Sequence, residues 1–342
     1  MKEELTKNEI KNLIDETELT QNQLNYLHHS LLQFGINDDK FDDFLSKRDL
    51  LYLKDTIFNI LVKNGDLKTI CTKINSNDTF VDINSLVNGN NIYEVIPFLS
   101  KETIYDLGKI TISNNTITKG CFEILLQFIL NDISEENKGR CDINFKDGRG
   151  IECKMPRGRV AGQKNIQSPV LIDQYFNKFG LNISGIYSNE NNISQVVNKL
   201  RYEYKYNNKQ LFKVLLEGIY AQFLKTPKVK EVDALYKLTK SSIFIENGFS
   251  ISSFRKLIGC VQLAEYAKSE KFDYILIFKG NAAVKTKGQK TYEYALKNGD
   301  YVIFDNTFAA NIENTYNCKN LLLKEGCSCS GPRTYACVIG YL

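Results

Sequence analysis

The chain has 342 residues, of which 43% are hydrophobic and 25% charged, with a net charge of +4. That length suffices for one large or two modest domains, and the composition is ordinary for a globular protein. The 44 basic residues nearly balance the 40 acidic ones. The bulk charge therefore does not by itself indicate nucleic-acid binding. A DNA-binding surface would have to come from local clustering of basic residues.

Membrane and secretory segments are not expected. No run of about 18 apolar residues occurs, and the polar N-terminus has no apolar signal region. Nine scattered cysteines favour reduced thiols and a cytoplasmic protein. Four of them gather near the C-terminus, where zinc binding and free thiols both remain open: Cys318, Cys327, Cys329 and Cys337.

Residues 1–115 are predicted to form a helical N-terminal region. Apolar residues recur at helical spacing through residues 1–70, most clearly in the stretch 50–62. His28 and His29 are adjacent, so they would point in different directions on a helix and make a poor joint metal site. Residues 75–118 mix short apolar runs with Asn-rich turns and look like a linker.

The pattern of apolar and polar residues changes after residue 115. Residues 121–130 are strongly apolar and predict a helix, and a polar loop follows at 131–140. Two short alternating segments, 141–145 and 150–154, flank the turn at Asp147-Gly148 and predict a β-hairpin.

Further elements complete an α/β pattern. Helical spacing recurs at 196–206, 210–224 and 254–268, and apolar strands are predicted at 272–278, 301–305 and 335–339. Helices followed by near-continuous apolar strands favour a mixed α/β layer. We therefore predict an α/β domain over residues 116–342.

The hairpin contains the candidate catalytic and metal-binding residues. Because side chains alternate along a strand, Glu152 and Lys154 share one face, and Asp142 shares it if the polar faces of the two strands coincide. Two carboxylates suit Mg²⁺, which prefers oxygen ligands and keeps several waters. Such a metal can activate a water for attack on a phosphodiester, and a nearby lysine can orient that water.

An acid-x-lysine triplet is weak evidence by itself, since several others occur in the chain, for example Glu203-Tyr204-Lys205. Context selects Glu152, because it alone follows a turn on a strand whose partner strand begins with an acid. The alternative interpretation is a surface hairpin whose acids and lysine only face water.

Asp142 followed by Glu152-Cys153-Lys154 resembles the signature of the PD-(D/E)xK nuclease superfamily. The resemblance covers about 45 residues. It implies a restriction-endonuclease-like fold, which is a mixed β-sheet flanked by helices with the active site on a hairpin. It also implies Asp142 and Glu152 as metal ligands and Lys154 at the attacking water. Glu123, on the preceding helix, matches an acid that often supports the metal in this superfamily. One departure is Cys141, which stands where the family usually has proline.

Residues 155–164 follow the triplet and predict a Gly- and Arg-rich loop. Arg157, Arg159 and Lys164 are candidate phosphate contacts, and Gln163 stands where the superfamily often has a polar helper residue. For Gln163, an ordinary loop glutamine is an equal alternative. The Lys- and Tyr-rich stretch 201–209 could also stack on nucleic acid, but a solvated helix face is the favoured interpretation.

We therefore expect a Mg²⁺-dependent DNA endonuclease, with Mn²⁺ as a substitute metal. Its partner is DNA, and cutting both strands of a duplex would imply a homodimer. The alternative is a structural or assembly protein that carries the same fold, such as a virion component. The Asn-, Lys- and Ile-rich composition indicates an AT-rich genome, which fits many bacteria and their viruses. The expected location is the cytoplasm, or a virion under the alternative. The substrate class, whether duplex, single-stranded or branched DNA, or RNA, stays open.

Overall fold

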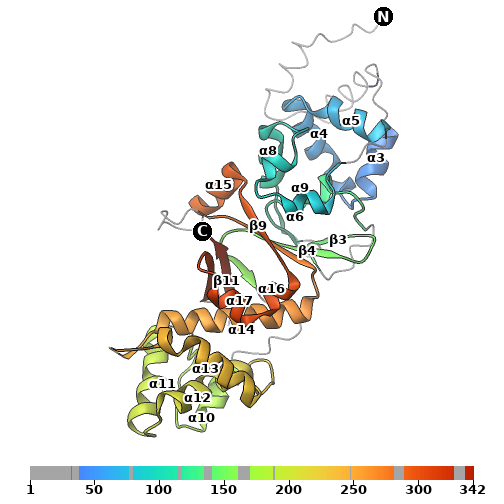
Figure 1. Cartoon of the computed structure of the whole chain (residues 1–342). Coiled ribbons are helices and arrows are strands. Elements are labelled where there is room, and N and C mark those ends of the chain that lie inside the picture. The colour runs from blue at the N-terminus through green and yellow to red at the C-terminus, as the bar shows by residue number, and fades with distance from the viewer. Residues whose placement is uncertain are drawn as a thin grey trace, which may run out of the picture. The chain divides into compact units, whose positions relative to one another are not determined.

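The computed structural model describes residues 32, 38–76, 80–113, 118–134, 141–160, 170–187, 189–246, 248–280, 289–326 and 336–342. The chain divides into two compact units (Figure 1). Unit 1 is Met1–Cys153 with Gln289–Ile303, and unit 2 is Lys154–Gly288 with Phe304–Leu342. The domain boundary predicted at residue 115 is based on sequence composition, whereas these two units are defined by contacts. The boundary therefore stays a prediction.

Unit 1 is mainly helical. Its helices are α3 (Asp38–Ser46), η1 (Leu51–Leu53), α4 (Lys54–Lys63), α5 (Leu67–Ser76), α6 (Ile83–Asn88), α7 (Ile92–Val95), α8 (Lys101–Lys109), α9 (Glu123–Ile129) and α15 (Gln289–Asn298). Its strands are β1 (Ile112–Ser113), β2 (Thr118–Lys119), β3 (Ile143–Asn144), β4 (Gly150–Lys154) and β9 (Tyr301–Asp305), of which β4 and β9 run on into residues of unit 2.

The predicted helical character of the N-terminal region is confirmed for its described part by α3 to α5. The linker-like prediction for 75–118 is wrong, because α6, α7 and α8 lie there. These helices begin after Asp82, Asn91 and Ser100, and each of these side chains accepts a hydrogen bond from a backbone N–H in the first turn. Such residues are strong helix-start signals, but the helices are too short to show a clear apolar period.

Arg48 ties the turn after α3 to the end of α9. Its guanidinium donates to the carbonyl oxygens of Phe128 and Leu130, each at 3.2 Å, and its Cζ lies 3.7 Å from the centre of the Phe44 ring. Burial lowers the pKa of Arg48 to about 10, although the charge of Asp132 acts in the opposite direction. A cation at the last carbonyls of α9 also complements the helix dipole.

Replacing Arg48 by methionine is expected to destabilise the protein by about 2 kcal/mol, because two buried carbonyls lose a charged donor. The matched control is Lys47→Met, since Lys47 forms an exposed ion pair with Asp43 that contributes little. Urea unfolding of both variants provides the measurement. Equal unfolding midpoints for the two would show that Arg48 does not hold α9.

Unit 2 combines a sheet with helices. Its strands are β5 (Gly158–Val160), β6 (Phe244–Ile245), β7 (Gly248–Phe249), β8 (Tyr274–Phe278), β10 (Leu321–Gly326) and β11 (Ala336–Tyr341). Its helices are α10 (Val170–Asn177), α11 (Glu190–Tyr202), α12 (Asn208–Ala221), α13 (Val229–Ile243), α14 (Ile251–Glu270), α16 (Asn306–Ala310) and α17 (Ile312–Asn317).

The sheet of unit 2 contains both kinds of strand pairing. β10, β11 and β5 pair antiparallel in that order, with Leu323 opposite Ile339 and Ile339 opposite Gly158. A parallel bridge joins Lys279, just after β8, to Tyr341 in β11. The helix α14 packs on this sheet, and α16 and α17 pack on α14. The predicted α/β class, a mixed sheet flanked by helices, is thereby confirmed.

Helices α10 to α13 form a helical lobe around one apolar core that also takes in the first half of α14 (Figure 1). Its helices pack closely: a Cβ added at Gly218 in α12 would lie 2.4 Å from the ring of Phe176 in α10. The predicted helices 196–206 and 210–224 correspond to α11 and α12. The first ends at Tyr202 rather than 206, since Lys205 adopts a left-handed backbone with φ of 53°.

The described helices include none that combines the length and the apolar character needed to cross a bilayer. Even α14, at 20 residues, carries Arg255, Lys256, Glu265 and Lys268 within its length.

Candidate active site

The predicted hairpin is present and is formed by β3 and β4. Ile143 pairs with Ile151 and Asn144 with Gly150, in antiparallel register. The turn closes with a hydrogen bond from the N–H of Phe145 to the carbonyl oxygen of Arg149, at 2.9 Å. Gly148 has a φ of 86°, a conformation that suits glycine and explains the Asp-Gly sequence of the turn.

The register fixes which side chains share a face. Continuing the pairing one step outward sets Asp142 opposite Glu152, and directly opposed residues of an antiparallel pair point to the same side. A carboxylate oxygen of Asp142 accepts a hydrogen bond from the N–H of Cys153 at 2.8 Å, which holds this side chain against β4. Lys154 follows two residues after Glu152 on the same strand and so shares its face.

Glu152 is buried, with only 5% of its surface exposed. The alternate residues Ile143, Ile151 and Cys153 are also buried, so both faces of β4 are covered along its first four residues. The alternative of a surface hairpin whose acids merely face water is therefore wrong for Glu152. Glutamate is rarely buried in proteins, which makes the position a candidate functional site.

Lys154, at the end of β4, is half-buried and lies beside an aromatic ring. Its Nζ is 5.9 Å from the centre of the Tyr266 ring on α14, within reach of a cation–π interaction. A Cβ added at Gly158 would come within 3.3 Å of Cδ of Lys154, so the chain passes close to the lysine stem just before β5. Sequence reasoning missed Tyr266, since nothing in the sequence indicates that α14 packs here.

Glu123 is the first residue of α9 and turns back over the preceding backbone. A Cβ added at Gly120 would lie 2.6 Å from a carboxylate oxygen of Glu123. Burial, and then the charge of Glu123, raise the pKa of Cys121. Among the described residues no three His, Cys, Asp or Glu side chains are grouped so as to hold a metal ion, so Glu123 does not form such a triplet with Asp142 and Glu152.

The predicted loop after the triplet is partly wrong. Gly158–Val160 form β5, which pairs with β11, because the N–H and C=O groups of this segment complete the sheet. Arg157 and Arg159 are both exposed, the first in a tight turn with φ of 66° and the second on β5. Gln163 and Lys164 lie outside the described residues. So do Cys327 and Cys329, and the zinc alternative stays open.

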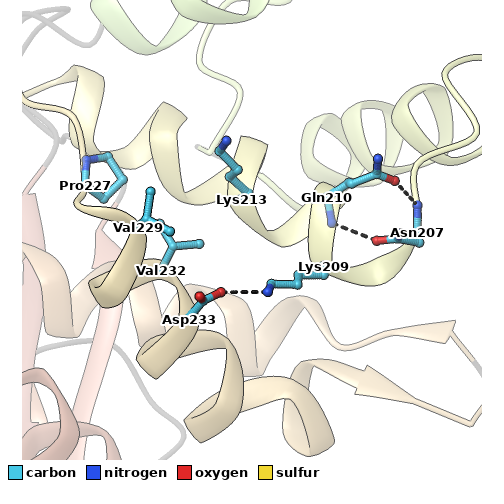
Figure 2. A pocket seen from close by; sticks show the side chains of 8 residues that line it. All are labelled: Asn207, Lys209, Gln210, Lys213, Pro227, Val229, Val232 and Asp233. Carbon is cyan, nitrogen blue, oxygen red and sulfur yellow. Dashed lines mark hydrogen bonds and ion pairs between the residues drawn. The ribbon is translucent and has the colours of Figure 1, made fainter.

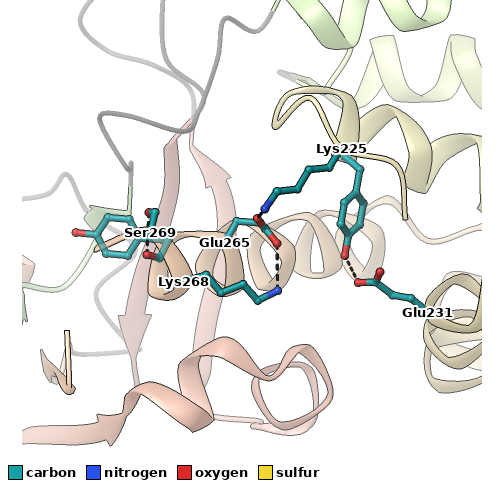
Figure 3. A network of polar contacts seen from close by, with 7 residues as sticks. Lys225, Glu231, Glu265, Lys268 and Ser269 are labelled. Atoms are coloured by element: carbon teal, nitrogen blue, oxygen red, sulfur yellow. Dashed lines mark hydrogen bonds and ion pairs between the residues drawn. The ribbon is translucent and has the colours of Figure 1, made fainter. Parts of the chain in front are cut away.

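Glu265, next to Tyr266 on α14, is engaged by two lysines. Its carboxylate forms ion pairs with Lys225 and, at 3.1 Å, with Lys268 (Figure 3). Burial raises the pKa of Glu265, but the hydrogen bonds from the two lysines outweigh it, and the pKa lies below its usual value of 4.5. This carboxylate is therefore already neutralised by the protein and is a poor candidate for a metal ligand.

A surface cavity of about 300 Å³ lies at the N-terminal ends of α12 and α13 (Figure 2). Lys209 and Asp233 form an ion pair of 2.8 Å across it. The residues that line this cavity do not come from the hairpin, and they do not reproduce its pair of acids with a lysine. The hairpin is thus the better candidate for hydrolytic chemistry.

Neither family models, nor curated proteins, nor solved structures match this chain.

Asp142→Ala is expected to cost about 1 kcal/mol of folding free energy, because the N–H of Cys153 loses its acceptor. Asp142→Asn keeps an acceptor oxygen and is expected to retain most of that stability. Thermal unfolding of both variants gives the comparison. Equal losses would mean that the carboxylate does not hold the hairpin through this bond.

Glu265→Gln is expected to lose about 1 to 2 kcal/mol at neutral pH, since the buried side chain no longer compensates two lysines. Because the folded-state pKa of Glu265 is depressed, its contribution is complete above 4.5 and is lost as pH falls through the lower folded-state value. Urea unfolding between neutral and acid pH should therefore show the two proteins converging. Glu203→Gln, which removes an exposed ion pair with Lys199, serves as control and should change little.

Proposed function

We propose that this protein is a Mg²⁺-dependent DNA endonuclease of the restriction-endonuclease-like type. The observation that carries the proposal is the buried carboxylate of Glu152, which the hairpin register sets opposite Asp142 on a strand that continues into Lys154. The mixed sheet flanked by helices is compatible with this fold.

The residues present fit a magnesium site. Mg²⁺ is typically held by one or two protein carboxylates together with waters and substrate phosphate oxygens, so Asp142 and Glu152 form a sufficient protein contribution. When bound, magnesium would supply charge neutralisation at the phosphate and a more acidic water. Mn²⁺ has the same preference for oxygen ligands and would substitute. Glu123, at the start of α9, would act only as a supporting acid.

The remaining roles follow from position and charge. The ammonium group of Lys154, half-buried beside Tyr266, would orient the attacking water and donate hydrogen bonds to it. The exposed guanidinium groups of Arg157 and Arg159 would contact phosphate oxygens on either side of the scissile bond. Gln163 and Lys164, which lie outside the described residues, are further candidates for DNA contact on the sequence alone. We place the activity in the cytoplasm or in a virion, with the enzyme acting as a homodimer on duplex substrates.

The alternative, an assembly protein with a nuclease-like fold, has one observation in its favour. Leu51 and Tyr52 on η1 are exposed by 45% and 46%, and paired exposed apolar side chains are typical of contact surfaces. We prefer the nuclease, because a contact surface on η1 does not explain why a carboxylate is buried on β4.

Cleavage of plasmid, single-stranded oligonucleotide and RNA should be assayed with Mg²⁺ or Mn²⁺ against EDTA. Wild-type protein is expected to cut in the presence of metal, and Asp142→Asn, Glu152→Gln and Lys154→Ala should each lower the rate by about a hundredfold or more. We expect each of these groups to contribute several kcal/mol of transition-state stabilisation. A loss of 1.36 kcal/mol lowers the rate tenfold, so a loss of this size gives about a hundredfold or more.

Asp147→Asn and Lys146→Ala provide matched controls, since both residues are exposed at the turn of the same hairpin. Both control variants should cut like wild type. Cleavage that survives Glu152→Gln would show that the active site lies elsewhere. Absence of metal-dependent cleavage on all three substrates would refute the nuclease proposal.

A further inference from the structure

The α11–α12 corner, defined as residues 199–209, joins two helices of the helical lobe. The helix α11 ends at Tyr202, and the N–H groups of Tyr204 and Tyr206 bond back to the carbonyl oxygens of Lys199 and Leu200 at 3.3 and 3.1 Å. Asn207 and Gln210 then form a reciprocal capping box that starts α12 (Figure 2). Hydrogen bonds thus hold the backbone on both sides of the corner, from which the tyrosines project.

Two tyrosine side chains at this corner are exposed to solvent. Tyr202 is 76% exposed, the largest value for any aromatic side chain in the described part of the chain, and Tyr204 is 40% exposed. The ring of Tyr204 packs edge-on against Phe179 at 5.4 Å and lies 5.7 Å from the ring of Tyr206. An exposed ring held by its neighbours can offer a flat surface to a ligand without first being ordered.

Three cations lie on or next to this corner. Nζ of Lys178 lies 3.5 Å from the centre of the Tyr175 ring and 5.1 Å from that of Phe179, the residue on which Tyr204 packs. Arg201 donates a hydrogen bond to the side chain of Asn208 at 3.2 Å, and Lys205 is exposed in its left-handed turn. Within the described residues none of these three cations forms an ion pair with an acid. Burial lowers the pKa of Lys178, and the charge of Glu217, which pairs with Lys213, acts in the opposite direction.

The acids nearby are engaged by other lysines. Glu203 pairs with Lys199 at 3.6 Å, and Asp233 pairs with Lys209 at 2.8 Å. The corner therefore keeps a local positive charge although the whole chain carries only +4. The favoured interpretation of this stretch from sequence, a solvated face of one helix, is wrong, because the stretch is a helix end, a turn and a helix start.

We propose that the α11–α12 corner binds single-stranded nucleic acid, with bases stacking on Tyr202 and Tyr204. Lys178, Arg201 and Lys205 neutralise the neighbouring phosphates. Exposed aromatic rings interleaved with cations are the means by which proteins hold single strands, and only an unpaired strand presents its base faces, since a duplex stacks them inside. The inference deepens the proposed function and rests on it for the choice of nucleic acid as partner.

Binding is measured by fluorescence anisotropy with a labelled oligodeoxythymidylate of about 16 nucleotides, in EDTA so that cleavage plays no part. Tyr202→Ala and Tyr204→Ala should each weaken binding about tenfold, the size expected for one stacked base. Tyr202→Phe keeps the ring face and should bind like wild type. A control variant is Tyr52→Ala, which removes a comparably exposed ring from η1 and should have no effect.

Charge is tested separately through the salt dependence. Lys205→Ala should lower the slope of log affinity against log salt by about 0.7, the value for one phosphate contact to a single strand. A matching duplex should compete poorly for the labelled strand. An oligouridylate of the same length tests whether the corner accepts RNA as well as DNA.

The proposal is overturned if Tyr202→Ala binds the oligonucleotide as tightly as wild type, or if duplex competes equally well. It is also overturned if the tyrosine variants change only the self-association of the protein in size-exclusion chromatography, which would mark a protein contact surface. If the protein binds the oligonucleotide but shows no metal-dependent cleavage, this inference is retained and the nuclease proposal is refuted. If the tyrosine variants cleave and bind like wild type, the nuclease proposal is retained and this inference is refuted.

Discussion

The candidate site depends on the register between β3 and β4. Because side chains alternate along a strand, a slip of one residue would turn Glu152 and Lys154 to the opposite face of the strand pair. The Asp-Gly turn, with Gly148 in a left-handed conformation, helps to set that register at one end. The hydrogen bond from the N–H of Cys153 to Asp142 secures it at the other end, so a candidate metal ligand also stabilises the strand pair.

Within each unit, contacts to a helix hold residues of the candidate set in place. In unit 1, Arg48 holds the C-terminal end of α9 through two carbonyl oxygens and so fixes the helix that carries Glu123. In unit 2, α14 places Tyr266 beside Lys154, and Glu265 of the same helix forms ion pairs with Lys225 and Lys268. A lysine whose ammonium group lies beside an aromatic ring loses fewer conformations on binding a substrate than one free in water, which suits a group that must orient a water molecule.

The two proposed sites would act on one substrate in different ways. The hairpin offers two carboxylates and a lysine for chemistry at a phosphodiester, and the α11–α12 corner offers rings and cations that hold an unpaired strand. Base stacking tolerates any sequence, so a corner of this kind would favour substrate structure over a particular base order. Both sites draw on local clusters of charge rather than on the bulk composition, which is nearly neutral.

The sequence by itself determined the hairpin, the apolar helix before it and the main helices and buried strands after it, because hydrophobic period and turn chemistry are local properties. It also named Asp142, Glu152 and Lys154 as one candidate set, since strand alternation follows from chain geometry alone. Only the tertiary structure decided that Glu152 is buried, that Tyr266 lies beside Lys154, and that Gly158–Val160 pair with β11 rather than form a loop. Burial and strand pairing depend on segments far apart in the chain, and no local pattern records which of them will meet.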